Sequence, residues 1–441
     1  MDMLPVFMAG SLLVLIFTGY PVPFILGGIA VIFLMLSGTP PQYMQNIASR
    51  MIGTAQDWLL LSIPVFVFMG LMLDKSGIAQ TLLYSLDRLL GRMKGGLAVA
   101  VVVLGTIMAA STGIVGASVV MLGLIGLPVM LREKYNPCIS AGVVAASGTL
   151  GILIPPSIML VMFGSLLQIP VGDLFKGALV PGLLLVALYI LFLLVVARLF
   201  PKLLPEGERA ARPQEPIGQL LWGLCKSLVP PLGLILCVLG SIFAGIATPT
   251  EAASLGALGT IILTICYGRM SWETLSDTVH ETGKITGMVM FVALLAPAFS
   301  ILFRHIGGTD MLKNALLGTS MGPYGILILI MGVIFILGFF LEWLEISYIL
   351  LPMLAGVIVQ LDFGYDLTNI QKLTWFALLV AVNLQSSFLT PPFGMSLFYI
   401  RGIAPEGITM NHVYKGIVPF VILQLSALAI IVMCPMLVLG W

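Results

Sequence analysis

The sequence has little charge of either sign. Only 9% of its 441 residues are charged, and the formal net charge is +1, whereas a soluble domain carries about 25% charged residues. Without a basic surface, we expect no nucleic-acid partner. Hydrophobic residues make up 59% of the chain, and the mean hydropathy is +1.13. These values predict a protein that crosses a lipid bilayer several times.

Residues and motifs of catalysis are equally scarce. The chain has three widely separated histidines and five scattered cysteines, so neither residue type has the spacing of a metal or redox site. It contains no H-E-x-x-H motif, no phosphate-binding G-x-x-x-x-G-K-[ST] loop, and no G-x-S-x-G with plausible partners. These absences argue against an enzyme, a zinc protease and an ATP-driven motor, and we expect no organic cofactor.

The long apolar runs that are present predict helices. A run such as residues 183–196 is continuous, whereas a β-barrel needs alternating segments of about ten residues. The N-terminus has no basic region or cleavage site, so we expect a retained span. Residues 78–94 predict an amphipathic helix on the membrane surface. Residues 271–284 predict a polar interfacial segment ahead of a span at 285–303.

Two apolar segments contain a Pro-Pro pair. Pro155-Pro156 lies within 139–167, and Pro391-Pro392 follows 236 positions later within 372–400. Proline lacks a backbone N–H, so each pair must interrupt its helix and leave carbonyl groups without partners. Two broken spans in matching positions of two halves are typical of a transporter binding site.

A polar tip precedes each broken span. Residues 97–131 turn at Ser111-Thr112-Gly113, and residues 323–360 turn near Glu342. Short apolar arms around such a tip predict a re-entrant hairpin, which is tolerated where its backbone is buried or lines a wet cavity. Two ordinary spans joined by a tight turn, or one glycine-rich span, are the alternatives.

The halves predict an internal duplication. Four features recur in order: Gly19 with Gly245, Pro23 with Pro249, Pro128 with Pro352, and Phe175-Lys176-Gly177 with Tyr414-Lys415-Gly416. We therefore expect an all-α polytopic membrane protein with a first repeat at 1–200, a hydrophilic linker at 201–217 and a second repeat at 218–441. The repeats are inverted if each crosses the membrane an odd number of times, and the basic residues do not settle the orientation.

Oxygen atoms at the breaks predict one Na⁺ site in each half. Free carbonyls and Ser or Thr hydroxyls are the ligands that a small hard cation takes. Close helix packing is the alternative explanation for these small polar residues. The first site would use Ser111, Thr112, Gly113, Gly148, Thr149, Ile154 and Pro155; the second would use Gly338, Glu342, Ser386, Ser387, Thr390 and Pro391.

An organic anion is expected between the two cation sites, because helix N-termini attract carboxylates. We assign it Ser118, Ser157, Glu345 and Gly394. Glu342 and Glu345 share a helix face with apolar residues on both sides, and such acids bind a cation, relay a proton or line water. Glu251 fits better as an acid at a helix N-terminus.

These motifs resemble one transporter family. The runs Gly148–Ser157, Gly245–Ala253 and Leu389–Pro392, together with Ile63–Gly70 and Lys75-Ser76-Gly77, are similar to the large membrane subunit of tripartite ATP-independent periplasmic (TRAP) transporters. The resemblance extends from about residue 15 to 420. The second acid, Glu345, departs from the single acid of many members and puts the second cation site in doubt.

The resemblance implies an elevator-type, Na⁺-coupled importer of a small organic acid in the bacterial inner membrane. It also implies two partners, a separate small membrane subunit and a periplasmic substrate-binding protein that delivers the solute. The alternative function is a stand-alone Na⁺/carboxylate symporter of related fold that needs no binding protein. The sequence does not name the solute.

Overall fold

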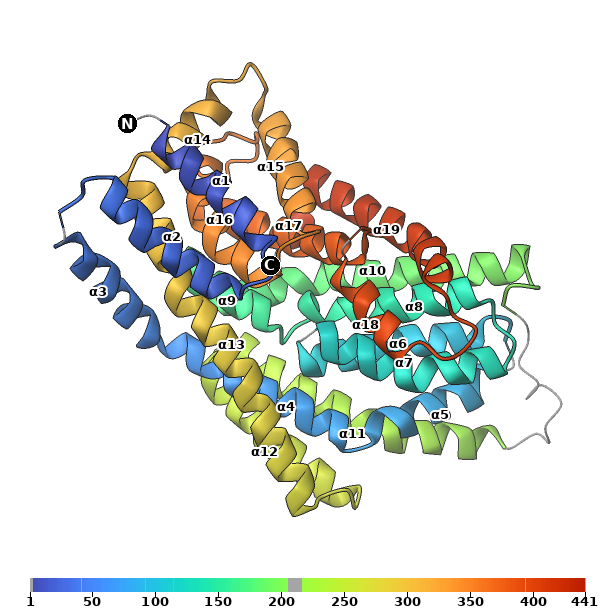
Figure 1. Cartoon of the computed structure of the whole chain (residues 1–441). Helices are drawn as coiled ribbons and strands as arrows, with labels where there is room; N and C mark the ends of the chain where they lie inside the picture. Colours follow the sequence, from blue (N-terminus) through green and yellow to red (C-terminus); the bar gives the residue numbers. More distant parts are fainter. Residues whose placement is uncertain are drawn as a thin grey trace.

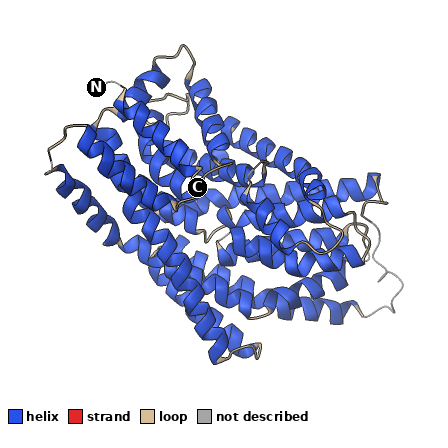
Figure 2. Ribbon diagram, in the orientation of Figure 1, coloured by secondary structure: helices blue, strands red, loops and turns tan. Residues whose placement is uncertain are grey.

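The computed structural model describes residues 3–40, 42–91, 93–113, 115–204, 216–392 and 394–440. It gives the backbone but not the side chains of Ser111, Thr112 and Ile217. Throughout this part of the chain the regular structure is helical, without a strand (Figure 2). The prediction of an all-α protein is therefore confirmed.

The helices follow one another with short connections (Figure 1). Those of the first half are α1 (Leu4–Ile16), α2 (Val22–Leu36), α3 (Tyr43–Ala55), η1 (Trp58–Leu61), α4 (Ser62–Lys75), α5 (Ile78–Leu90), α6 (Gly96–Thr112), α7 (Val115–Arg132), α8 (Pro137–Thr149), η2 (Leu150–Ile152), α9 (Ile158–Leu167) and α10 (Val171–Leu199). Those of the second half are α11 (Ile217–Phe243), α12 (Pro249–Cys266), α13 (Trp272–His305), α14 (Gly308–Leu317), α15 (Pro323–Leu337), α16 (Trp343–Ile358), α17 (Asn369–Leu389), α18 (Met395–Ile403), α19 (Met410–Met433) and α20 (Met436–Leu439).

Eight helices in the described residues are long and apolar enough to cross a membrane. The longest is α13 with 34 residues. Shorter apolar helices such as α6, α8, α15 and α16 accompany them. This composition identifies the chain as a multi-pass membrane protein, as the sequence predicts.

The predicted helix breaks are present in both halves. The first broken helix comprises α8, η2 and α9, with residues 153–157 as the first break; the second comprises α17 and α18, with residues 390–394 as the second break. Phe393 lies outside the described residues. Both Pro-Pro peptide bonds are cis. The glycines matched in sequence, Gly19 and Gly245, both have positive φ, at 78° and 69°.

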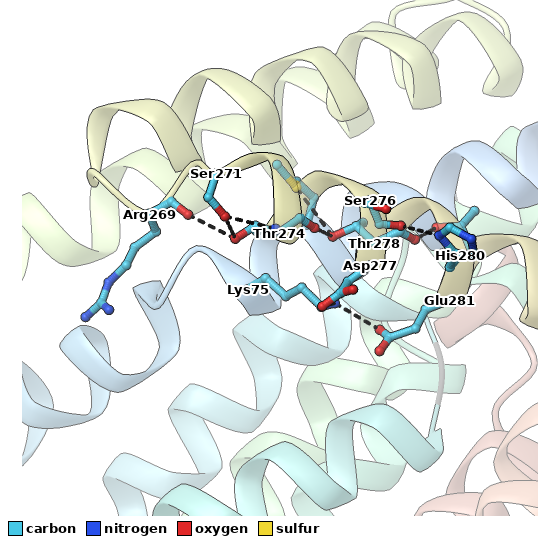
Figure 3. Close-up of polar contacts among 11 residues, drawn as sticks. Lys75, Arg269, Ser271, Thr274, Ser276, Asp277, Thr278, His280 and Glu281 are labelled. Carbon is cyan, nitrogen blue, oxygen red and sulfur yellow. Dashed lines mark hydrogen bonds and ion pairs between the residues drawn. The ribbon is translucent and has the colours of Figure 1, made fainter.

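The predicted interfacial segment at 271–284 and the predicted span at 285–303 are parts of one continuous helix, α13, and the interfacial position of its first part stays a prediction. Its polar residues have partners on α4 (Figure 3). Lys75 Nζ lies 3.6 Å from Asp277 and 3.5 Å from Glu281, and the Thr278 hydroxyl contacts the Met72 sulfur at 3.7 Å. These contacts join α13 to α4, and α13 continues without a turn at Lys284.

Smaller differences concern the ends of helices and the linker. The polar interval after residue 39 contains α3, and α10 begins at Val171, seven residues before the predicted span. Residues 78–90 form the predicted helix, α5. Most of the predicted linker, 205–215, lies outside the described residues. The structure does not test the assignment of two repeats, which stays a prediction.

The two helices that lead into the breaks form the centre of the core. Residues 140–149 of α8 and 374–389 of α17 are buried without exception. Glycine permits α8 to cross α19 closely, because a Cβ on Gly142 in α8 would lie 2.1 Å from the carbonyl oxygen of Gly416 in α19. The breaks are therefore held inside a tightly packed bundle.

Candidate functional site

The two broken helices and two helix pairs meet at one cavity, here called the tip pocket. The first helix pair is α6 and α7, which turn at Gly113; the second is α15 and α16, which turn at residues 338–342. The pocket has a volume of about 310 Å³. Its lining residues are Gly113, Val115, Gly116, Ala117, Ile158, Ile285, Met288, Val289, Glu342, Trp343, Leu344, Phe388, Met395 and Tyr399.

Four helices begin at the tip pocket. Val115 starts α7, Ile158 starts α9, Trp343 starts α16 and Met395 starts α18, and all four residues line the cavity. A helix N-terminus presents backbone N–H groups without intrahelical partners and the positive end of the helix dipole. Four helix starts therefore bring partial positive charge to the pocket without a basic side chain, while the Glu342 carboxyl and the C-terminal ends of α6 and α17, at Gly113 and Phe388, bring negative charge.

The first helix pair packs directly on the first broken helix. A Cβ on Gly113 would lie 3.3 Å from the backbone nitrogen of Ile158, and one on Gly148 would lie 2.8 Å from Val119 Cα. Ser118 is buried and faces Gly151. Ser111 and Thr112 end α6, next to Gly113, but their side chains lie outside the described residues.

The residues of the first break are all buried. Ile154 and Pro155 lie within it, and Ser157 occupies the N-cap position of α9, where its hydroxyl donates to the carbonyl oxygen of Ile152 at 2.6 Å. Thr149 donates to the Ala146 carbonyl at 2.8 Å. Each hydroxyl uses its proton within its own segment and keeps lone pairs for another partner.

The second helix pair packs on the second broken helix in a similar way. A Cβ on Gly338 would lie 2.2 Å from Ser387 Oγ. The hydroxyls of Ser386, Ser387 and Thr390 all donate to carbonyls of α17, at 3.0, 2.8 and 2.8 Å. Pro391 follows within the break, and Gly394 is the N-cap residue of α18.

The two acids of the second tip have different surroundings. Glu342 lines the tip pocket as the N-cap residue of α16. Glu345, in the first turn of that helix, is only 3% exposed and does not line the pocket. Its Oε2 atom is buried and has no hydrogen-bond partner. Burying a carboxylate without a hydrogen-bond partner is costly, so a cation beside Glu345 would stabilise its charged form.

The structure thus gathers each predicted cation set beside its own break, with the two tips facing one pocket. Of the predicted cation residues, Gly113 and Glu342 line that pocket. The residues assigned to the anion do not line it, but Ser157 and Gly394 directly precede the lining residues Ile158 and Met395.

A buried polar cluster between the halves was not predicted from sequence. The Gln424 amide donates to Tyr189 Oη at 2.8 Å and to Thr149 Oγ1 at 3.4 Å, and the Gln385 amide donates to the same Thr149 atom at 3.4 Å. All four side chains are fully buried. One signal existed: Thr149 and Gln385 are 236 positions apart, the offset between the two Pro-Pro pairs.

Paired tips and broken helices around one pocket are typical of secondary transporters. Within that class, the chain belongs to the TRAP family. Residues 9–437 match the model of the tripartite ATP-independent periplasmic transporter, DctM component. Members of this family are transporter permeases, in agreement with the prediction that the chain is not an enzyme.

Individual relatives carry names with different solutes. A C4-dicarboxylate TRAP transporter large permease protein of Pseudomonas aeruginosa is 30% identical over 90% of this chain and 88% of its own. A sialic acid TRAP transporter large permease protein of Vibrio cholerae is 28% identical, over 97% and 96%. The YdaH transporter structure of Alcanivorax borkumensis shares the fold, with a TM-score of 0.60 at 15% identity over 91% and 90%.

Proposed function

We propose that this chain is the transport subunit of a TRAP system that imports a small organic acid across the bacterial inner membrane, driven by Na⁺. The observation that carries the proposal is the start of four helices at one pocket. Free N–H groups and helix dipoles bind a carboxylate without a basic side chain. Membership of the TRAP family also supports this proposal.

The lining of the tip pocket suits a small solute with an apolar body. Its volume of about 310 Å³ lies at the lower end of the usual range for ligand sites. Phe388, Met288 and Ile285 supply nonpolar walls. The relatives are named for C4-dicarboxylates, sialic acid and ectoine, so our proposal for the solute is limited to its class, a small carboxylate.

Na⁺ coupling is supported by the oxygen atoms beside each break. In the first half, Ser147 Oγ is buried and has no hydrogen-bond partner, whereas Thr149 Oγ1 already accepts from the Gln385 and Gln424 amides at 3.4 Å. In the second half, Ser387 and Thr390 flank the break, and Glu342 and Glu345 add negative charge. A bound cation in the second half would neutralise this charge before a carboxylate enters.

We further propose that both helix pairs are re-entrant and move with the broken helices as one elevator unit of two inverted repeats. The other helices, including α13, would form the static wall. A separate small membrane subunit and a periplasmic substrate-binding protein would complete the system. A fused relative, the isethionate TRAP transporter permease protein DctMQ, supports the first partner, because this chain covers 65% of its length.

The test is uptake into proteoliposomes that contain this chain, its small subunit and its binding protein. We expect radiolabelled solute to accumulate only with an inward Na⁺ gradient, and Thr149→Ala and Thr390→Ala to raise the Na⁺ concentration needed for half-maximal uptake. Uptake that is unchanged after the gradient is abolished would refute Na⁺ coupling. Equal uptake without the binding protein would instead identify a stand-alone symporter.

A further inference from the structure

A second cavity, here called the arginine pocket, has no role in the function proposed above. It has a volume of about 520 Å³. One wall consists of α3, η1 and the C-terminal half of α13, and the other of α9 and α16. Arg50, Asp57 and Arg304 are the charged side chains that line it.

The two arginines have no acidic partner in the described part of the chain. The acids Asp277 and Glu281, for example, pair with Lys75 and not with either arginine. Asp57 lines the same cavity, but its carboxylate accepts hydrogen bonds from the Leu59 backbone N–H, at 3.0 Å, and from the Ser165 hydroxyl. Two arginines and one aspartate therefore line one cavity, with a net charge of +1.

The position of the arginines is not explained by helix ends alone. Arg304 lies in the last turn of α13, where the helix dipole favours a cation. Arg50 lies within α3, away from its last turn, so the dipole does not account for it. Guanidinium groups match carboxylates through paired N–H donors. Two arginines that line the same cavity therefore favour an anionic ligand.

The arginine pocket continues the tip pocket along one seam between helices. Three helices, α9, α13 and α16, line both cavities. Along α13, Val289 lines the tip pocket and Pro297 the arginine pocket, which corresponds to about 12 Å at 1.5 Å per residue. Along α16, Leu344 and Tyr348 are about one helical turn apart. The three shared helices therefore place the two cavities next to each other along one seam.

We propose that the arginine pocket is a second anion site, which binds the carboxylate of the solute on its path to or from the tip pocket. The role on this path rests on the proposed transport function, whereas anion binding at Arg50 and Arg304 does not. A lipid phosphate has the same charge, but the seam shared with the tip pocket favours the solute. The experiment below separates the two.

The test measures how fast a cysteine in the arginine pocket reacts with a charged reagent. Thr54 lines this pocket, so Thr54→Cys is made in the full-length chain after its five cysteines are replaced by alanine. The chain is placed in phosphatidylcholine nanodiscs. Its reaction with anionic sulfonatoethyl methanethiosulfonate is compared with that of the neutral methyl reagent by intact-protein mass spectrometry.

We expect Arg50→Gln with Arg304→Gln to lower the ratio of anionic to neutral rates about tenfold, which corresponds to about 1.4 kcal/mol, because both positive charges that attract the anionic reagent are removed. Lys226→Gln with Arg269→Gln removes the same charge outside both pockets, and should leave the ratio within about twofold. Arg50→Lys with Arg304→Lys should retain most of the ratio, which shows that a loss reflects charge rather than misfolding.

Protection by solutes identifies the ligand. Succinate, ectoine and N-acetylneuraminate are each added, and at least one should slow the anionic reaction severalfold in the Thr54→Cys chain but not after both arginines become glutamine. An unchanged rate ratio in the glutamine variant, or protection by none of the three, overturns the proposal. So does protection by added phosphatidylglycerol alone, which would identify a lipid site. Failed uptake with intact protection would refute only the transport function.

Discussion

The first and second helix pairs approach their broken helices equally closely, but the glycine that permits the approach lies on opposite sides of the contact. In the first half, Gly148 belongs to the broken helix and faces the backbone of Val119 in α7. In the second half, Gly338 belongs to the helix pair and faces the side chain of Ser387 in α17. The close approach is thus shared by the halves, while the residue that permits it is not.

The two breaks also differ in exposure and charge. Every residue of the first break is buried, whereas Thr390 and Pro391 are half-buried and Pro392 is exposed in the second. Only the second tip has carboxyl groups, on Glu342 and Glu345. We therefore expect the first half to be the more rigid contact, and the second half to be where ion and solute exchange with water.

Gly148→Ala should have the largest effect on stability. The added Cβ would lie 2.8 Å from Val119 Cα and 3.0 Å from its backbone nitrogen, and backbone atoms cannot move aside as a side chain can. We expect a loss of about 3 kcal/mol in the free energy of unfolding, measured by dodecyl sulfate titration in mixed micelles.

Two variants make this prediction specific. Val119→Ala should rescue Gly148→Ala only in part, because it removes the contact of the new Cβ with Val119 Cγ2 at 2.4 Å but leaves the backbone contact at 2.8 Å. Gly151→Ala is the matched control on the same broken helix, since its Cβ would meet only ordinary contacts at 3.5 Å or more. Full rescue by Val119→Ala would show that the first contact is no more rigid than the second.

Gly338→Ala should cost less, about 2 kcal/mol by the same titration. Its Cβ would meet the Ser387 hydroxyl at 2.2 Å, and a side chain can be removed. Ser387→Gly should therefore restore most of the loss. Gly332→Ala in the same helix is the control, because nothing lies within 4 Å of its Cβ. If Ser387→Gly gives no recovery, the proposed difference between the halves is wrong.

The sequence was sufficient for features that depend on local backbone chemistry. Pro155-Pro156 and Pro391-Pro392 must interrupt a helix wherever they stand, so both breaks were predictable. Gly113 and Glu342 were also placed correctly at tips, because a polar turn between short apolar arms has few other solutions.

Features that depend on distant partners were not predictable in this way. Asp277 and Glu281 pair with Lys75, which lies far away in the sequence, so the local pattern gave no sign of these ion pairs. Gln385 and Gln424 lie in apolar runs, where a lone glutamine carries no signal of its partner. Tyr189 similarly looked like one more apolar residue of a span.

Gln424→Leu should cost more than Gln385→Leu, about 1.5 against about 0.5 kcal/mol in the same titration. Gln424 donates two hydrogen bonds, to Tyr189 and Thr149, whereas Gln385 donates one at 3.4 Å. Loss of Gln424 also leaves the buried Tyr189 hydroxyl without this partner. Tyr189→Phe should therefore recover part of the loss, and a double-mutant cycle without coupling would contradict the hydrogen bond.

The smallest expected effect concerns the starts of α2 and α12, which follow the matched glycines Gly19 and Gly245. Thr248 and Glu251 form a capping box at α12, in which the Thr248 backbone N–H donates to Glu251 at 2.8 Å and the Glu251 N–H donates to Thr248 Oγ1 at 3.3 Å. This confirms the structural role expected for Glu251. The equivalent N-cap of α2, Pro21, has no side-chain hydrogen bond.

Thr248→Ala should lower the free energy of unfolding by about 1 kcal/mol, the usual value of an N-cap. Thr248→Ser keeps the hydroxyl and serves as the control, with an expected loss of only a few tenths of a kcal/mol. Because α2 starts without such a cap, Pro21→Ala should change stability less than Thr248→Ala does. Equal losses at both positions would show that the cap adds nothing to the stability of α12. Packing alone would then hold the start of α2 in the first half and of α12 in the second.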